Sequence, residues 1–198
     1  MSRIAVVYYS ATGNIAAMAA ALADGARAEG AEVRVRRVAE TAPAEAIAAN
    51  PRWQAFVDAA TDPLATLDDL VWAQGLAFGS PTRFGGPAAQ LKAFLDTTGS
   101  LWFRGELASK VCTSFTTAST GHGGLESTIL AMNNHFYHWG SVIVPLGYAD
   151  EHVARVTGNP YGASFVSRKS AAPDAESLEA CRLQGRRLAR VTARLADA

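Results

Sequence analysis

The stretch that decides the fold covers residues 4–15 and reads Ile4-Ala5-Val6-Val7-Tyr8-Tyr9-Ser10-Ala11-Thr12-Gly13-Asn14-Ile15. Its first half is an unbroken apolar run, mostly β-branched or aromatic, which is typical of a strand buried on both faces of a parallel sheet. Its second half is rich in hydroxyl, amide and glycine residues. Beyond it, apolar side chains recur at helical spacing, as in Ile15, Met18 and Leu22. The stretch therefore predicts a strand, a polar loop and a helix in direct succession.

The same alternation of strand and helix continues along the chain. We expect further strands at 31–37, 74–79, 109–115 and 141–145, and helices at about 87–97, 125–138 and 174–196. In the second strand, charged Arg34 and Arg36 alternate with valines, which indicates an edge position. Five strands, each followed by a turn and a helix, predict an α/β fold with a doubly wound sheet.

Two segments break this pattern. Residues 41–70 contain three prolines and short helical pieces around 52–60 and 64–70, whereas residues 146–173 show no clear period. We interpret both as loop-rich excursions from a single domain that spans residues 1–198. Excursions this long are usually functional or lie at interfaces.

Composition narrows the class of protein. Of 198 residues, 49% are hydrophobic and 18% charged, and the formal net charge is zero. Such a chain folds, and it lacks the basic character of a nucleic-acid-binding protein. Its apolar runs are too short for a secretion signal or an integral membrane segment. Cys112 and Cys181 lie far apart, without metal or redox spacing, so we expect packed thiols in a cytoplasmic protein.

Three polar loops follow the first, third and fourth strands, and all of them fall at the carboxyl edge of a parallel sheet. Ser10 to Asn14 offer hydroxyls and helix-terminal N–H groups, which suit a phosphate held without a cation, although an ordinary helix cap explains them equally well. Pro81 to Gly85 combine donors, a cation and an aromatic face, as an isoalloxazine requires. Thr116 to Gly124 are hydroxyls and glycines that can approach a ribityl chain. Each loop alone could be a simple turn, but together they indicate a site for FMN.

The chain also resembles the WrbA family of NAD(P)H:quinone oxidoreductases along essentially its whole length. The stretches that carry the resemblance are Val7 to Ser10 with Gly13 and Ile15, Phe78 to Gly85, Phe94 to Trp102, Gly121 to Gly124 with Glu126, Val142 to Tyr148, and Pro160 to Ala163. The resemblance implies a flavodoxin-like sheet with strand order 2-1-3-4-5. It also implies bound FMN, NADH or NADPH as co-substrate, and two-electron reduction of quinones by a ping-pong hydride transfer through flavin N5. Members are typically homotetramers whose flavin pockets are completed by neighbouring chains.

The resemblance assigns roles to individual residues. It implies that the FMN phosphate is held by Ser10, Ala11, Thr12, Gly13, Asn14 and Ile15, that the isoalloxazine is lined by Pro81, Thr82, Arg83 and Phe84, and that the ribityl chain and ring meet Thr116, Thr117, Ala118, Ser119, Thr120, Gly121 and Gly123. It makes His138 the catalytic residue beside the flavin and Trp102 part of the wall for nicotinamide and quinone. Thr12 stands where many members carry a nicotinamide-contacting tyrosine, so it is also a candidate substrate contact.

Several alternatives stay open at this point. Trp102 by itself is more typical of a core or interface aromatic. His135 and His138 have the i, i+3 spacing of a metal pair, but no carboxylate or cysteine is predicted to join them. His122 is expected to be exposed near the site. The competing functions are a one-electron carrier of the flavodoxin type, a flavin-dependent interaction protein without quinone reductase activity, and a reductase of azo or nitro compounds.

Overall fold

The computed structural model of the chain describes residues 1–148, 150–156 and 158–196. Its strands are β1 (Arg3–Tyr8), β2 (Glu32–Arg37), β3 (Gly75–Arg83), β4 (Gly86–Pro87), β5 (Val111–Ala118), β6 (Val142–Ile143) and β7 (Ser164–Val166). Its helices are α1 (Asn14–Ala28), α2 (Ala44–Ala48), α3 (Pro51–Ala59), α4 (Leu67–Trp72), α5 (Ala89–Asp96), α6 (Gly99–Phe103), α7 (Leu125–Trp139), α8 (Glu151–Val156) and α9 (Ala175–Ala196), with a short 3-10 turn, η1, at Arg168–Ser170.

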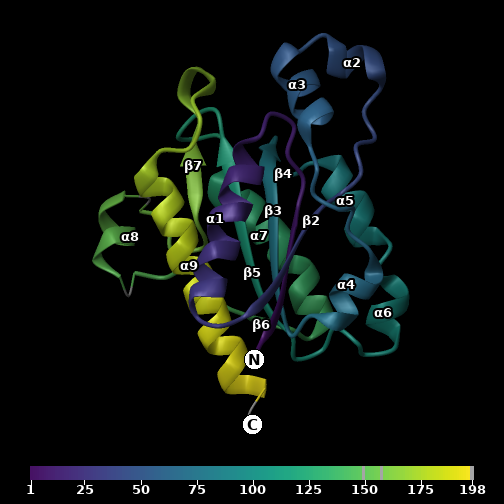
Figure 1. Cartoon of the computed structure of the whole chain (residues 1–198), viewed down its shortest axis with the longest axis vertical. Coiled ribbons are helices and arrows are strands. Elements are labelled where there is room, and N and C mark those ends of the chain that lie inside the picture. The colour runs from purple at the N-terminus through teal and green to yellow at the C-terminus, as the bar shows by residue number, and fades with distance from the viewer. Residues whose placement is uncertain (149, 157, 197–198) are drawn as a thin grey trace.

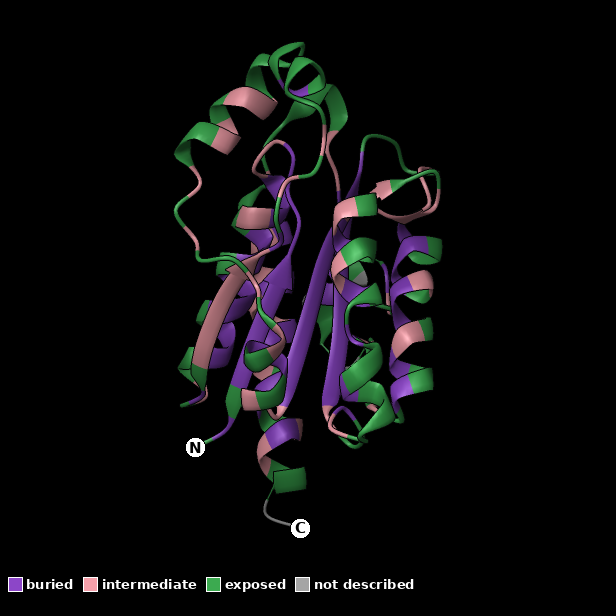
Figure 2. Cartoon of the chain, turned by 90° about the vertical axis from the view of Figure 1, so that its right-hand side faces the viewer, coloured by how far each residue is buried: buried purple, intermediate pink, exposed green. Residues whose placement is uncertain are grey.

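The sheet is built on five parallel strands in the order β2-β1-β3-β5-β6. Counted along the chain among these five, this is the predicted 2-1-3-4-5 order, and the doubly wound α/β fold is confirmed. β2 lies at the edge, as its alternating arginines predicted, and Figure 2 shows it only partly buried beside the buried central strands. The last of the five strands is shorter than predicted, with only Val142 and Ile143 in β6.

Two further strands were not predicted, so the sheet has seven rather than five. β4 pairs antiparallel with β3, and β7 pairs parallel with β5. β3 and β5 also run on beyond the predicted strand ends, so that Pro81 lies opposite Thr117. The loops after the third and fourth strands therefore begin from one rigid, hydrogen-bonded ladder.

Helices cover both faces of the sheet, with α1 and α9 side by side on one face and α5 and α7 on the other (Figure 1). Successive side chains of β1 point to opposite faces. Ile4 and Val6 join the apolar cluster under α1 and α9, whereas Ala5 and Val7 join the cluster under α5 and α7. Burial on both faces explains why this strand is apolar throughout.

Glycine lets α1 and α9 approach each other closely. A β-carbon added at Gly185 would lie 2.0 Å from the carbonyl oxygen of Leu22, and one added at Gly25 would lie 2.0 Å from that of Arg182. Both helices therefore pack backbone against backbone at these points.

The two excursions contain more regular structure than the sequence predicted. The first forms α2, α3 and α4, and Figure 1 shows α2 and α3 standing above the carboxyl ends of the strands. The second, interpreted from its sequence as loop-rich and without clear period, contains α8, β7 and η1. Its path is set by buried Gln184 of α9, whose Oε1 accepts from Ala163 N–H at 2.7 Å and whose Nε2 donates to Thr113 Oγ1 at 2.6 Å. Among the helices described, none is long and apolar enough to span a bilayer.

Candidate cofactor site

A cavity of about 260 Å³ opens at the carboxyl ends of the strands. It is lined by Ser10, Ala11, Thr12, Asn14, Ile15, Asn50, Arg52, Pro81, Thr82, Arg83, Thr117, Ala118, Ser119, Ser167 and Ser170. The three polar loops singled out in the sequence thus meet in one place, as expected for a ligand site in a doubly wound sheet. Four lining residues come from the two excursions and were not foreseen: Asn50, Arg52, Ser167 and Ser170.

The first loop presents the N-terminus of α1 to this cavity. Gly13 has φ of +92°, a left-handed conformation that glycine adopts without strain, and its N–H donates to Ser10 Oγ at 3.0 Å. The first helical hydrogen bond runs from Ala17 N–H to the Gly13 carbonyl, at 2.9 Å. The three preceding N–H groups, from Asn14 to Ala16, therefore have no acceptor within the helix and are available to an anion.

Asn14 connects this loop to the segment after β7 by hydrogen bonds. Its Nδ2 donates to Ser167 Oγ at 2.9 Å and to the Ala171 carbonyl at 3.2 Å. Ser167 Oγ in turn donates to the same carbonyl at 2.7 Å. These bonds hold the segment after β7 against the start of α1, which explains why Ser167 and Ser170 reach the cavity.

The Thr82 hydroxyl ties the second loop to the third. It donates to the Gly123 carbonyl at 3.1 Å and accepts from Gly85 N–H at 3.2 Å and from Thr128 Oγ1 at 2.7 Å. A hydroxyl has one donor and two acceptor positions, so its capacity is filled. Thr82 thereby fixes the distance between two walls of the cavity.

Charge in the cavity is positive. Its described lining contains Arg52 and Arg83 and no carboxylate. The sequence analysis predicted a phosphate held without a cation, and it did not foresee that α3 brings Arg52 to the cavity from a distant part of the chain. A positive cavity with helix-terminal N–H groups favours a doubly charged phosphate ester.

The carboxylate of Glu40 joins three elements beside the cavity. It accepts from Tyr9 Oη at 2.9 Å, Trp53 Nε1 at 2.9 Å and Gln90 Nε2 at 2.7 Å. The backbone N–H groups of the two following residues also donate to it, each at 2.9 Å. Burial alone would raise the pKa of Glu40, but the hydrogen bonds outweigh it and hold the pKa below the ordinary value. The carboxylate is therefore ionised at neutral pH and anchors α3 next to β1 and α5.

Some predicted site residues do not line the cavity in this chain. Gly13, Phe84, Thr116, Thr120, Gly121 and Gly123 belong to the three loops but are not among its lining residues. Thr116 is fully buried and its hydroxyl donates to the Ser80 carbonyl at 2.6 Å, whereas the side chain of Phe84 is fully exposed with φ of +52°. His122 is exposed, as expected.

His138 and Trp102 lie elsewhere on the chain. They border a shallow depression between α6 and the end of α7, where Trp102 Nε1 donates to the His138 carbonyl at 2.8 Å. α7 starts beside the cavity at Leu125, and His138 follows 13 residues later, which at 1.5 Å per residue is roughly 20 Å along the helix. Within one chain, neither side chain reaches the cavity. In the described residues no group of histidine, cysteine or carboxylate side chains could hold a metal ion.

The parallel sheet and a positive, hydroxyl-lined cavity at its switch point define a mononucleotide-binding protein of the flavodoxin-like class. A sequence model of the family described as NADPH-dependent FMN reductase matches residues 2–154. The chain belongs to this family, and the resemblance inferred from sequence is confirmed.

Relatives in this family support the assignment. The chain is 46% identical over 166 residues to an NAD(P)H dehydrogenase (quinone) of Deinococcus radiodurans, covering 83% of each protein. It is 42% identical over 203 residues to an NAD(P)H dehydrogenase (quinone) of Sinorhizobium fredii, covering all of both. A solved structure, the flavodoxin, WrbA-like protein from Agrobacterium tumefaciens, aligns with a TM-score of 0.68 and 25% identity over 98% of this chain and 99% of that one.

Proposed function

We propose that this protein is an FMN-dependent enzyme that reduces quinones to hydroquinones with NADH or NADPH. The observation that carries the proposal is the cavity, where the α1 N-terminus, two hydroxyl-bearing loops and two arginines converge and no carboxylate is found among the described lining residues. Its donors fit the phosphate and ribityl chain of FMN, and the family and its quinone-reducing members supply the reaction class.

The chain's own residues bind and orient the cofactor in this proposal. Ser10, Thr12 and the free N–H groups of α1 hold the phosphate, and Thr117 and Ser119 meet the ribityl chain. FMN, when bound, supplies the hydride-accepting ring that passes two electrons from the nicotinamide to the quinone. Arg83 lines the same cavity, and its positive charge would stabilise negative charge that develops on a bound ring.

The enzyme acts as a homotetramer in this proposal, and His138 and Trp102 serve a neighbouring protomer's cavity. Three observations support it. Both side chains lie far from their own cavity. Aromatic side chains are exposed on the same two helices, with exposed fractions of 52% for Trp102, 84% for Phe103 and 69% for Tyr137. The family resemblance also implies pockets that are completed by neighbouring chains. Exposed aromatic clusters are typical of interfaces. In such an assembly His138 orients a quinone oxygen or relays a proton, and Trp102 forms the wall for nicotinamide and quinone.

The absorption spectrum of the purified protein tests the reaction. We expect the bands of oxidised flavin, bleached by NADH or NADPH and restored by benzoquinone. Parallel double-reciprocal plots are expected if nicotinamide and quinone use one slot in turn, and intersecting plots would contradict the ping-pong cycle. A flavin that no nicotinamide bleaches would overturn the enzyme and favour a one-electron carrier or an interaction protein.

Subunit mixing tests the shared site. A His138→Ala variant and a variant with a disabled cavity, Ser10→Glu, are each expected to be inactive alone, and co-refolding them is expected to restore part of the activity. Sedimentation with and without FMN reports the assembly. Monomers that retain full activity would refute this part of the proposal.

The cytoplasm is the compartment we propose for the enzyme. Cys112 and Cys181 are both free and fully buried, and burial raises the pKa of each thiol to about 12. Such thiols are inert packing groups, which suits a reducing compartment. Export of the protein to an oxidising compartment in its native host would contradict this placement.

A further inference from the structure

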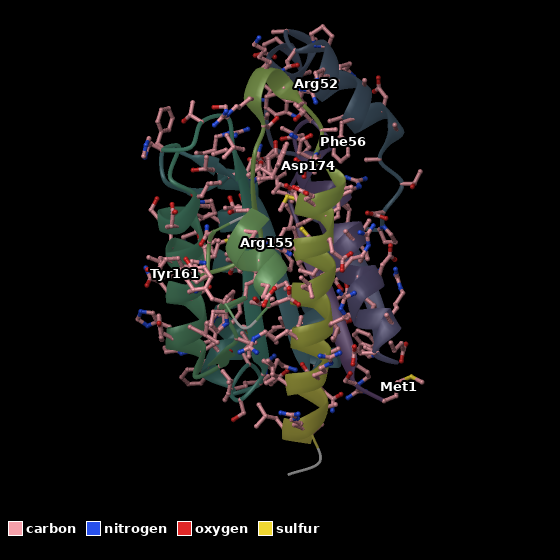
Figure 3. All side chains as sticks on the ribbon, turned by 90° about the vertical axis from the view of Figure 1, so that its left-hand side faces the viewer. Met1, Arg52, Phe56, Arg155, Tyr161 and Asp174 are labelled. Atoms are coloured by element: carbon pink, nitrogen blue, oxygen red, sulfur yellow. The ribbon has the colours of Figure 1, made fainter. Side chains whose placement is uncertain are left out.

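One face of α3 is turned toward the phosphate loop. A β-carbon added at Gly13 would lie 3.5 Å from Cδ2 of Phe56, and the Phe56 ring packs on the apolar cluster under α1 and α9. Arg52 precedes Phe56 by four residues, so both occupy the same face of the helix. Figure 3 shows the two side chains together at the end of the molecule where α3 stands. This placement explains why Arg52 lines the cavity with Ser10 and Thr12.

The start of α3 is held at two points. Asn50 caps the helix, because its Oδ1 accepts from the N–H groups of Arg52 at 3.1 Å and Trp53 at 3.4 Å. Pro51 occupies the first helical position, where a backbone N–H has no partner within the helix, so its missing N–H removes no helical hydrogen bond. The indole N–H of Trp53 is then bound by Glu40. Arg52 therefore projects from a turn that is fixed on both sides.

The positive charge of Arg52 is available to a ligand. Within the described residues its guanidinium forms no ion pair, whereas Arg34 and Arg36 of β2 share the carboxylate of Asp69 at 3.2 and 3.0 Å. The other arginine of the cavity, Arg83, has its guanidinium engaged with the Thr82 carbonyl at 3.0 Å.

We propose that α3 is a cap that carries Arg52 to the terminal phosphate of FMN, and that Glu40 is the positioning residue that holds this cap in place. The inference deepens the proposed function and rests on FMN as the ligand of the cavity. The phosphate is then bound by helix-terminal N–H groups and hydroxyls on one side and by a guanidinium on the other. Arg52 thereby selects a phosphorylated flavin over riboflavin, because riboflavin has the same ring and ribityl chain but offers no charge.

The test compares FMN with riboflavin on the full-length chain after removal of its flavin, with affinity measured by flavin fluorescence. We expect Arg52→Gln to weaken FMN binding about tenfold, the scale of one charge-assisted hydrogen bond, and to change riboflavin binding by less than about twofold. Arg52→Lys keeps a point charge and is expected to recover part of the loss. Salt is expected to weaken FMN binding less in Arg52→Gln than in the unaltered protein.

Glu40→Gln tests the positioning role. In either orientation the amide places a donor where an acceptor stood, so either the Trp53 indole or the two backbone N–H groups lose their partner. We expect a smaller loss of FMN affinity with riboflavin little changed, and no additional loss when Glu40→Gln is combined with Arg52→Gln. Arg27→Gln, at an exposed arginine at the other end of α1, is the matched control and is expected to change neither affinity.

Equal losses for FMN and riboflavin, or no loss for either, would overturn the inference. So would an Arg52→Gln variant that binds FMN normally and is impaired only with NADPH and not with NADH, because Arg52 would then serve the nicotinamide cofactor. Failure of the unaltered chain to bind any flavin would instead refute the proposed function. The two failures are thus distinguished in one binding experiment that needs no enzymatic turnover.

Discussion

Thr82→Val is the change that tests most directly how the cavity is built. Valine has nearly the shape of threonine, so the substitution removes the hydroxyl and leaves the packing. Three partners then lose a hydrogen bond: the Gly123 carbonyl, the Gly85 N–H and the Thr128 hydroxyl. The effect is therefore expected on two walls of the cavity at once.

The magnitude follows from the burial of these groups. A hydrogen bond contributes about 0.5–1.5 kcal/mol net, and a buried group left unpaired costs more than an exposed one. Thr128 is fully buried, with the Gly86 carbonyl at 3.4 Å as its remaining acceptor, whereas Thr82, Gly85 and Gly123 are partly exposed and water can replace part of the loss. We expect a loss of about 2 kcal/mol in the free energy of unfolding, or roughly 4–8 °C in Tm.

Urea unfolding of the flavin-free chain measures the stability, and flavin fluorescence measures FMN affinity, which is expected to fall as the two loops separate. Thr97→Val is the matched control, because its exposed hydroxyl makes only a local bond to the Phe94 carbonyl, and a change within about 0.5 kcal/mol is expected. Adding Thr128→Val to Thr82→Val is expected to cost less than the sum of the single changes.

Two results would refute this reasoning. If Thr82→Val unfolds at the same urea concentration as Thr97→Val, the hydroxyl does not tie the loops together. If it loses FMN affinity while keeping full stability, Thr82 is a direct cofactor ligand and its bonds in the structure are incidental.

Three other predictions concern the frame around the cavity. Gly185→Ala gains up to about 1 kcal/mol in helix propensity but brings its β-carbon to 2.0 Å from the Leu22 carbonyl oxygen. We therefore expect urea unfolding to show a net loss of about 2–3 kcal/mol in the free energy of unfolding, and a net gain would contradict the close helix contact. Asn14→Ala is expected to speed hydrogen exchange around Ser167 and to weaken FMN binding about threefold to tenfold, and unchanged exchange there would refute its role as a tether. Burial alone would raise the pKa of Asp69, but its hydrogen bonds and the β2 arginines outweigh burial and lower the pKa. The contribution of Asp69 to the free energy of unfolding is therefore fully present above about pH 4 and is lost as pH falls through the lowered pKa. The stability difference between the native chain and Asp69→Asn is therefore expected to shrink in acid, and a constant difference from pH 6 to about pH 3 would contradict it.

The sequence by itself determined the frame of the fold and the first loop of the site. Residues 4–15 specify strand, loop and helix through local properties, namely an apolar run, turn-forming residues and helical spacing. The edge position of β2 also followed, because a strand buried on both faces has a different pattern from one in which valine alternates with arginine, whereas the strand order was implied by the family resemblance. The meeting of three polar loops was predictable for the same reason, since parallel strands end at one edge.

Only the tertiary structure decided what closes the cavity. β7 has three residues, and Gln184 holds the residue just before it, Ala163, from 21 positions away in sequence, so no local periodicity predicts this strand. Arg52 lies in an excursion whose path depends on Glu40, and nothing near Arg52 in sequence marks it as a neighbour of the phosphate loop. Loops and helix faces can be read from spacing, but a guanidinium brought in from a distant helix depends on long-range packing, which spacing does not encode.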